Sequence, residues 1–262
     1  MKTAIQLYTL RNEAKEDLEG VLKLVHDAGY DGVELAGRYG RTGEEMRILL
    51  KKYGLTPISA HIGLSAAMDE KELKEYREIG IEYAVIPMTP QPTEENKDEI
   101  LSNLAAAAEN LKEFGFIPGY HNHSYEFEFS SEGKTWYDVL AEAVPYVMTE
   151  LDLCWLEVGG ADPVEYIHKY KDRVRLLHVK DFVGHGHLTK PDGTMPASPL
   201  DEGLEFDQRP VGDGVLDLGG IIEAAKKCGT EWLVVELDEP QKNKSMAECA
   251  VRSAEALKEY LK

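Results

Sequence analysis

The stretch KEDLEGVLKLVHDAGYDGVELA, residues 15–36, indicates how the whole chain folds. Four apolar residues in its first half recur at intervals of three and four, which places them on one face of a helix: Leu18, Val21, Leu22 and Val25. Gly29 then provides a stop signal, because glycine readily adopts the left-handed conformation that ends many helices. The run DGVELA at 31–36 follows directly and is typical of a short strand. The stretch therefore predicts a helix that leads straight into a strand.

The same alternation of strand-like and helix-like segments continues along the chain. Strands are expected at 4–8, 31–36, 56–61, 82–87, 116–121, 147–152, 174–179 and 232–237. Eight such units in 262 residues predict a single (β/α)8 barrel, the TIM-barrel architecture, whose usual length is about 250 residues. A doubly wound open sheet usually has fewer strands at this length, and a nucleotide-binding one would carry a glycine-rich turn after its first strand. The segment TLRNEAKED at 9–17 has no glycine, so the barrel is favoured.

The predicted domain organisation is one TIM-barrel domain spanning 1–262, with one long loop. This loop is rich in Gly, Pro and Asp and runs from about 181 to 214. A loop of this length inside a compact domain is usually functional. We therefore expect it to form part of the active site, as a lid or a substrate wall.

Composition limits the partners. The net charge of −19 disfavours nucleic acid and anionic membranes, and favours a neutral small molecule or a cation. No apolar run approaches the roughly 18 residues that a membrane span needs. The three cysteines are odd in number and form no CxxC pair, which is compatible with a reducing, cytoplasmic location. The sequence leaves open whether identical copies associate into a homo-oligomer.

Ionisable residues stand at six of the eight expected strand ends: Glu34, His61, His121, Asp152, His178 and Glu236. The active site of such a barrel lies where the strands end, a position normally surrounded by an apolar interior. Because side chains alternate along a strand, residues two apart share a face. His123 should therefore point to the same mouth as His121, Lys180 to the same mouth as His178, and Asp238 to the same mouth as Glu236.

Four of these residues form a candidate metal site. Asp152, His178 and Glu236 come from separate strands and can converge on one divalent ion, and His121 is best placed as the fourth ligand. Mixed oxygen and nitrogen ligands suit Mn²⁺, Mg²⁺, Co²⁺ or Zn²⁺ without selecting one strongly. A single histidine at a strand end is more often a structural hydrogen-bonding group, and a single Asp or Glu is more often a helix cap, but four such residues together favour the metal.

Other residues allow two interpretations each. Lys180 could be catalytic or could pair with a surface carboxylate. Glu34 and His61 could contact substrate or make structural hydrogen bonds. Trp155 could stack on a sugar ring or pack in the interior.

The chain resembles the xylose isomerase-like (AP endonuclease 2) TIM-barrel superfamily, in the sugar phosphate isomerase/epimerase branch that includes the inosose dehydratases. The matching motifs span nearly the whole chain: QLYTLR (6–11), AGYDGVEL (28–35), SAH (59–61), GYHNHSYEF (119–127), ELDLCW (150–155), LLHVKD (176–181), VGDGVLDL (211–218) and VVELD (234–238). This resemblance implies a metal held by Glu, Asp, His and Glu from four strands, the last three being Asp152, His178 and Glu236.

The resemblance transfers less cleanly to the fifth strand. His121 stands where many members of the superfamily carry the first ligand, a glutamate. Some relatives carry a catalytic histidine two residues later, which implies a base role for His123. Glu126 is the alternative first ligand and a further candidate base.

These residues suit the removal of a proton next to a carbonyl, through an enediolate stabilised by a divalent metal. Glu236, Glu126 or His123 could be the base, and Lys180 an acid or second electrophile. The expected function is a metal-dependent sugar isomerase or epimerase, and the alternative is a dehydratase or lyase acting on a keto-sugar or keto-inositol. The acidic composition favours an unphosphorylated sugar or cyclitol. The negative net charge disfavours a DNA-repair endonuclease. A non-catalytic alternative is a metal-stabilised protein that binds a sugar without converting it.

Overall fold

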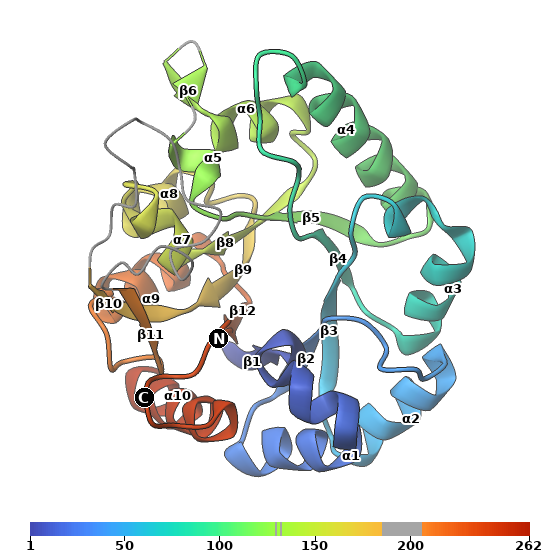
Figure 1. Cartoon of the computed structure of the whole chain (residues 1–262), viewed down its shortest axis with the longest axis vertical. Coiled ribbons are helices and arrows are strands. Elements are labelled where there is room, and N and C mark those ends of the chain that lie inside the picture. Colours follow the sequence, from blue (N-terminus) through green and yellow to red (C-terminus); the bar gives the residue numbers. More distant parts are fainter. Residues whose placement is uncertain (129, 132, 185–205) are drawn as a thin grey trace.

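The computed structural model describes residues 1–128, 130–131, 133–184 and 206–262. Eight parallel strands close a barrel in the order β1-β12-β9-β8-β5-β4-β3-β2, which confirms the predicted TIM-barrel fold (Figure 1). The barrel strands are β1 (Lys2–Gln6), β2 (Gly32–Leu35), β3 (Thr56–His61), β4 (Tyr83–Ile86), β5 (Ile117–His121), β8 (Met148–Asp152), β9 (Val174–Val179) and β12 (Trp232–Val235).

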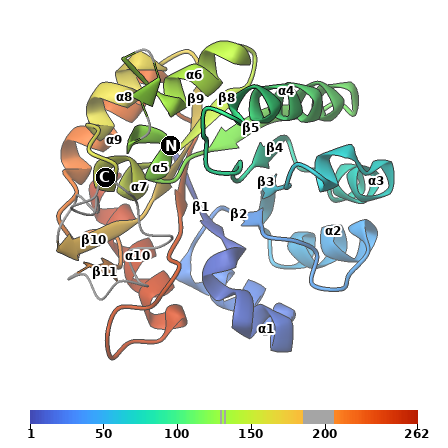
Figure 2. The same cartoon turned by 45° about the horizontal axis from the view of Figure 1, so that its top comes forward.

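Helices surround the strands (Figures 1 and 2). The longer ones are α1 (Arg11–Ala28), α2 (Gly43–Lys52), α3 (Glu70–Ile79), α4 (Lys97–Glu113), α6 (Trp136–Ala143), α9 (Leu218–Cys228) and α10 (Met246–Tyr260). The shorter ones are α5 (Tyr125–Glu128), α7 (Leu153–Val158), α8 (Pro163–Lys169) and the 3-10 turns η1 (Leu7–Leu10) and η2 (Ala66–Met68). Among the helices that the structure describes, none is both long and apolar enough to cross a membrane.

Local sequence signals set the ends of several helices. Gly29 ends α1 with φ of 84°, a left-handed conformation that costs glycine little. α2 begins with a capping box, in which Thr42 and Glu45 each bond the other's backbone amide. Such local capping signals end and begin the helices, so that the chain can turn back into the next strand.

The barrel interior has an apolar floor below a polar layer. Its floor is one cluster of buried side chains: Ala4, Ile58, Tyr83, Val85, Met148, Leu176, Trp232 and Val234. Side chains two residues further along a strand lie on the same face and nearer the mouth. Thus Glu150 lies above Met148, and His178 lies above Leu176. The strands therefore carry buried ionisable groups over a packed floor.

The first strand differs from its prediction. β1 ends at Gln6 rather than at residue 8, because the Gln6 side chain accepts a hydrogen bond from the Tyr8 amide and turns residues 7–10 into η1. Tyr8 is consequently 41% exposed rather than part of the strand. The other seven barrel strands overlap their predicted ranges closely.

Two small antiparallel sheets were not predicted. β6 (Ser130–Ser131) pairs with β7 (Lys134–Thr135), and β10 (Asp181–Gly184) pairs with β11 (Phe206–Arg209). Both strands of the second pair lie within the range predicted as a loop, about 181–214, so parts of that range form a small sheet. The central part of that loop, 185–205, lies outside the described residues.

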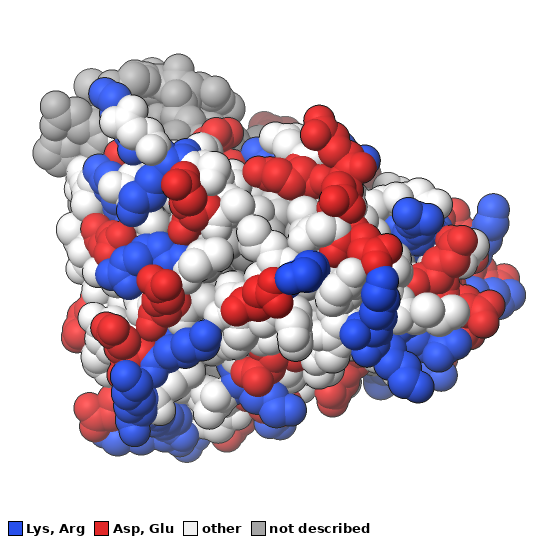
Figure 3. Space-filling model, turned by 90° about the horizontal axis from the view of Figure 1, so that it is seen from below, with Lys and Arg blue, Asp and Glu red and all other residues white. Residues whose placement is uncertain are grey.

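Acidic and basic side chains are interspersed on the face seen in Figure 3. Ion pairs at the surface include those of Arg47 with Glu44 and Glu78. The excess of acidic residues gives the chain its net charge of −19.

Candidate functional site

Ligand-type side chains gather at the mouth of the barrel in two overlapping groups. The outer group consists of His121, Asp152, His178 and Glu236, and the inner group consists of His61, His121, Glu150 and His178. Within each group, one ligand atom per residue lies within 4.8 Å of every other. Because His121 and His178 belong to both, the two groups form one continuous cluster.

Strand geometry brings the outer group together. His121 ends β5, Asp152 ends β8, His178 lies one residue before the end of β9, and Glu236 directly follows β12. The predicted four ligands are thus neighbours in the structure. Asp152 Oδ1 also accepts a hydrogen bond from the Trp155 amide, which caps α7 and fixes the carboxylate.

A buried lysine lies next to the two carboxylates of the outer group. Lys180 Nζ lies 3.2 Å from Asp152 Oδ2, 2.9 Å from Glu236 Oε2 and 2.8 Å from Asp238 Oδ2. Lys180 is 1% exposed, so its ammonium is a buried counter-ion and not part of a surface pair. Gln208 of β11 bonds Asp238 at 2.7 Å and so connects this carboxylate to the β10–β11 pair.

Buried hydrogen bonds through Glu34 hold two of the histidines of the inner group in place. His61 Nε2 lies 2.9 Å from Glu150 Oε2 and 3.1 Å from Glu34 Oε1. His178 Nε2 lies 2.7 Å from the same oxygen of Glu34. Gln6 Nε2 and Ser59 Oγ donate to the two oxygens of Glu34, at 2.7 Å and 2.5 Å. Both oxygens of Glu34 are therefore committed inside the barrel, which argues against the predicted substrate contact.

Burial and neighbouring charges set the ionisation of these groups. Burial alone would raise the pKa of Glu34 and of Glu236, but cationic neighbours hold both well below their usual value. Those neighbours are His61 and His178 for Glu34, and Lys180 and His178 for Glu236. Burial and the nearby charge of Glu34 raise the pKa of Glu150 to about 7.

The cluster fits a divalent cation. Four carboxylates, each at most 4% exposed, lie among the imidazoles of the two groups and supply negatively charged oxygen atoms: Glu34, Glu150, Asp152 and Glu236. Glu150 Oε1 and His121 Nδ1 are buried and have no hydrogen-bond partner among the described residues. Unpaired buried polar atoms are costly, and a bound ion would satisfy them.

His123 lies beside the cluster rather than in it. Its ring is 5.2 Å from the His121 ring, edge-on, and stacks with Tyr125 at 6.1 Å and Trp155 at 6.4 Å. Burial lowers the pKa of His123 to about 4, with the charge of Lys180 as a further cause. His123 is thus a neutral imidazole at neutral pH, next to the outer group.

Glu126 lies away from both groups. Its carboxylate accepts hydrogen bonds from the Tyr120 hydroxyl at 2.7 Å and the His123 amide at 2.8 Å. Tyr120 precedes His121 in β5, so alternation points it out of the barrel toward the helices. This placement argues against Glu126 as a metal ligand or base. Its contacts hold the backbone at His123.

Trp155 is more enclosed than a sugar-stacking residue would be. Its indole is 7% exposed, stacks with His123 and with Phe206 at 5.7 Å, and has Lys180 Nζ 5.0 Å from its centroid. These contacts favour packing around His123 and Lys180 over direct stacking on a substrate.

Glu150, Gln6 and Ser59 are parts of the site that sequence reasoning missed. Each lies two residues before a position considered as a strand end: Asp152, Tyr8 and His61. Side chains two positions before a strand end face the same side as the residue at that end. Extending the alternation back along each strand, and not only forward from its end, would have identified all three.

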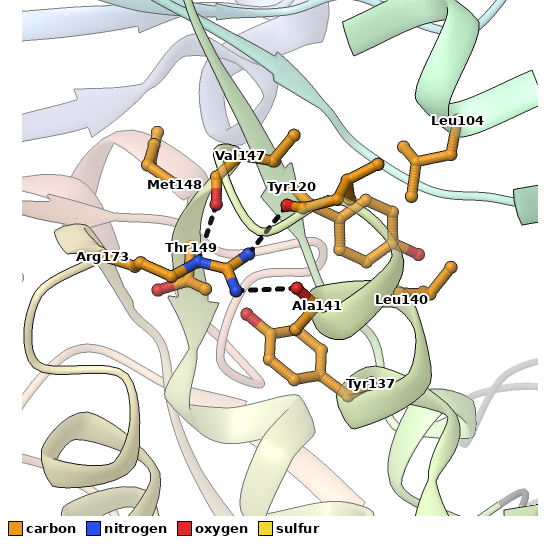
Figure 4. Close-up of a pocket in the computed structure, with 10 residues that line it drawn as sticks. Leu104, Tyr120, Tyr137, Leu140, Ala141, Val147, Met148, Thr149 and Arg173 are labelled. Carbon is orange, nitrogen blue, oxygen red and sulfur yellow. Dashed lines mark hydrogen bonds between the residues drawn. The ribbon is translucent and has the colours of Figure 1, made fainter.

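A small cavity lies elsewhere, between β5, β8 and the helices α4 and α6 (Figure 4). Its volume of about 10 Å³ is room for roughly one water molecule and not for a sugar. Arg173 borders it and donates hydrogen bonds to the carbonyls of Val147 and Ala141. We regard it as a packing feature.

Comparisons with known proteins agree with the fold. The rhizopine catabolism protein MocC of Rhizobium meliloti is 26% identical over 271 residues, covering 91% of this chain and 82% of that protein. An inosose dehydratase of Geobacillus kaustophilus is 26% identical over 190 residues, covering 62% of this chain and 61% of that protein. A solved sugar phosphate isomerase/epimerase structure from Parabacteroides distasonis has a TM-score of 0.78 at 23% identity, covering 100% of this chain and 96% of that one.

A family model described as "Xylose isomerase-like TIM barrel" matches residues 22–260. Since this match covers almost all of the 262 residues, the chain belongs to the xylose isomerase-like TIM-barrel family.

Proposed function

We propose that this protein is a divalent-metal-dependent sugar isomerase or epimerase that removes a proton next to a carbonyl. The observation that carries this proposal is the outer group, where two carboxylates and two imidazoles converge beside a neutral histidine and a buried lysine. His121, Asp152, His178 and Glu236 would hold the ion. Once bound, such an ion supplies Lewis-acid polarisation of the carbonyl and stabilises the negative charge of an enediolate.

His123 is the proposed base. Its low pKa keeps the ring neutral, and its Nδ1 has no hydrogen-bond partner in the described part of the chain. A neutral imidazole can accept a proton from a carbon next to the carbonyl and then return it. Return to the neighbouring carbon isomerises the sugar, whereas epimerisation would take its proton from solvent on the opposite face. Stacking on Tyr125 and Trp155 holds the ring in place.

Lys180 is proposed to act as a fixed positive charge. Burial would lower its pKa, but Asp152, Asp238 and Glu236 raise it well above its usual value, so the ammonium keeps its proton. It therefore stabilises charge on a substrate oxygen better than it donates a proton. Glu236, whose pKa is held well below its usual value, is a better ligand than base.

A dehydratase is the second candidate. The similarity to an inosose dehydratase favours it, because loss of a β-hydroxyl starts from the same proton removal. The substrate class in either case is an unphosphorylated sugar or cyclitol with a carbonyl.

NMR in D₂O tests the proposal. The metal-free chain is loaded with Mn²⁺ and incubated with a panel of keto-sugars and keto-cyclitols. We expect deuterium to enter a carbon next to the carbonyl of at least one substrate, and His123→Gln to abolish this exchange. A new conjugated-carbonyl absorbance would instead select the dehydratase. Absence of exchange across the panel, with Mn²⁺ bound, would favour a sugar-binding protein without turnover.

A further inference from the structure

We propose that the inner group, His61, His121, Glu150 and His178, is a second cation site that competes with the outer group for the same two histidines and prefers ions such as Zn²⁺ or Co²⁺. Zinc binding there does not depend on the proposed reaction. The site differs from the outer one in position, in ligand atoms and in chemistry.

The Glu150 carboxylate lies close to all three imidazoles of the inner group, at distances near those between ligands of one metal ion. Glu150 Oε2 lies 2.9 Å from His61 Nε2, 3.5 Å from His121 Nδ1 and 3.4 Å from His178 Nε2. Four ligands around an ion at about 2.1 Å, in a tetrahedron, stand about 3.4 Å apart. Small side-chain shifts would therefore complete the coordination.

Two buried atoms point independently to a missing ligand. His121 Nδ1 and Glu150 Oε1 have no hydrogen-bond partner within the described chain, although the residues are only 2% and 0% exposed. Nothing in the apolar floor beneath them can satisfy them. A cation between the three imidazoles and Glu150 would pair His121 Nδ1 directly.

The two groups use opposite nitrogens of the shared histidines. His178 turns Nδ1 toward Glu236 Oε2 at 3.2 Å and Nε2 toward Glu34 and Glu150. His121 turns Nε2 toward Asp152 Oδ2 at 3.9 Å and Nδ1 toward Glu150. A neutral imidazole has one lone pair and one N–H. Each histidine can therefore serve one group at a time.

In either arrangement, the second nitrogen of His178 has a carboxylate that accepts its hydrogen bond. With an ion in the outer group, the Nε2–H of His178 donates to Glu34. With an ion in the inner group, the Nδ1–H donates to Glu236. Such a bond on the second nitrogen orients a metal-bound histidine in many proteins. Both positions of the ion are thus supported, but not simultaneously.

Ligand chemistry separates the two sites. The inner group offers three imidazoles and one carboxylate, whereas the outer group offers two of each. Nitrogen-rich sets favour Zn²⁺ and Co²⁺, and oxygen-rich sets favour Mn²⁺ and Mg²⁺. Zinc in the inner group would withdraw His121 and His178 from the outer group and so displace Mn²⁺.

X-ray absorption on the zinc-loaded full chain, combined with Zn²⁺ and Mn²⁺ titrations, tests this inference. His61→Asn alters the inner group alone, and Asp152→Asn alters the outer group alone while keeping a residue type that can cap α7. We expect three imidazoles on zinc in the wild type and two in His61→Asn, with zinc affinity reduced at least about tenfold. Asp152→Asn should retain zinc and lose Mn²⁺, and one equivalent of zinc should release bound Mn²⁺ from the wild type.

Several results would overturn the inference: two imidazoles on zinc in the wild type, simultaneous binding of one Zn²⁺ and one Mn²⁺, or no zinc binding. Equal weakening of both ions by both substitutions would show one site with a supporting layer instead. Circular dichroism checks that the variants fold. If His61→Asn does not fold, Glu150→Gln replaces it. The number of imidazoles on zinc in the wild type can be measured without any variant.

Discussion

Glu34 Oε1 lies 2.7 Å from His178 Nε2, in a bond that crosses the barrel interior from β2 to β9. Both side chains are fully buried, and Gln6 and Ser59, which lie beside Glu34 on the two neighbouring strands, hold its carboxylate. The bond fixes the imidazole plane and places the Nε2 proton toward Glu34. His178 Nδ1 faces Glu236 Oε2 at 3.2 Å, and an ion in the outer group would take the place of the proton on this nitrogen.

Glu34→Gln should therefore weaken Mn²⁺ binding. The loss of an oriented acceptor behind a ligating histidine typically lowers metal affinity by about 10- to 100-fold. Titration of the metal-free chain with Mn²⁺, followed by electron paramagnetic resonance, measures the change. Glu142→Gln is the control, since Glu142 is an exposed carboxylate paired with Lys134. Equal Mn²⁺ affinity in wild type and Glu34→Gln would show that this bond does not position His178.

Lys180→Met should destabilise the metal-free chain. It removes the cation that Asp152, Glu236 and Asp238 share, and breaking a buried ion pair from one side costs about 3 kcal/mol or more. Mn²⁺ should reduce this deficit, because the ion takes over the neutralisation of Asp152 and Glu236.

Thermal unfolding with and without Mn²⁺ measures this effect. Lys134→Met removes an exposed lysine and serves as the control. If Mn²⁺ does not reduce the loss of thermal stability in Lys180→Met, the lysine and the ion do not both neutralise these carboxylates.

The sequence predicted the barrel well because its signals are local. The apolar face of α1 and the stop at Gly29 are readable within one segment, and the same holds for most units. The exception, β1, depends on the Gln6 side chain bonding the Tyr8 amide, a contact that no periodicity shows.

The site was predicted only where strand ends mark it. Asp152, His178 and Glu236 stand at such ends, but Glu150 lies one layer deeper and was missed. The predicted roles of Glu126, as metal ligand or base, are not favoured by its position. It is close to His123 in sequence, yet the out-facing Tyr120 draws its carboxylate to the helix side of the strand.

Glu126→Gln should change how stability depends on pH. Burial raises the pKa of Glu126 from its usual 4.5 to about 8, so the folded chain binds this proton more tightly than the unfolded chain. The resulting stabilisation is complete below about pH 4.5 and is lost as the pH rises toward 8. Glutamine does not ionise. As the pH rises from 5 to 8.5, the free energy of unfolding of the variant should therefore increase relative to that of the wild type, by on the order of a few kcal/mol.

Denaturant unfolding at several pH values measures that gap. Glutamine can still accept from the His123 amide and donate to the Tyr120 hydroxyl, so the contacts survive. A stability difference that stays constant from about pH 5 to 8.5 would mean that Glu126 does not titrate in this range.

Gly214→Ala should loosen the segment beside the β10–β11 pair. Asp181 accepts hydrogen bonds there from the amides of Gly212, Gly214 and Leu216, and a Cβ on Gly214 would lie 2.0 Å from Asp181 Oδ1. Such overpacking costs about 1–3 kcal/mol. Gly63→Ala, whose Cβ would meet nothing within 4 Å, should change stability by less than about 0.5 kcal/mol. Equal denaturant midpoints for the two variants would contradict the close packing on Asp181.

The manganese content of the metal-free chain after loading with Mn²⁺ and removal of free ion, measured by plasma mass spectrometry, tests the central claim most directly. We predict about one Mn²⁺ per chain in the wild type and in the control Glu142→Gln, and almost none in Asp152→Asn or Glu236→Gln, because each removes a charged ligand from the outer group. Wild-type manganese content in both ligand variants would contradict an ion held by these four strands.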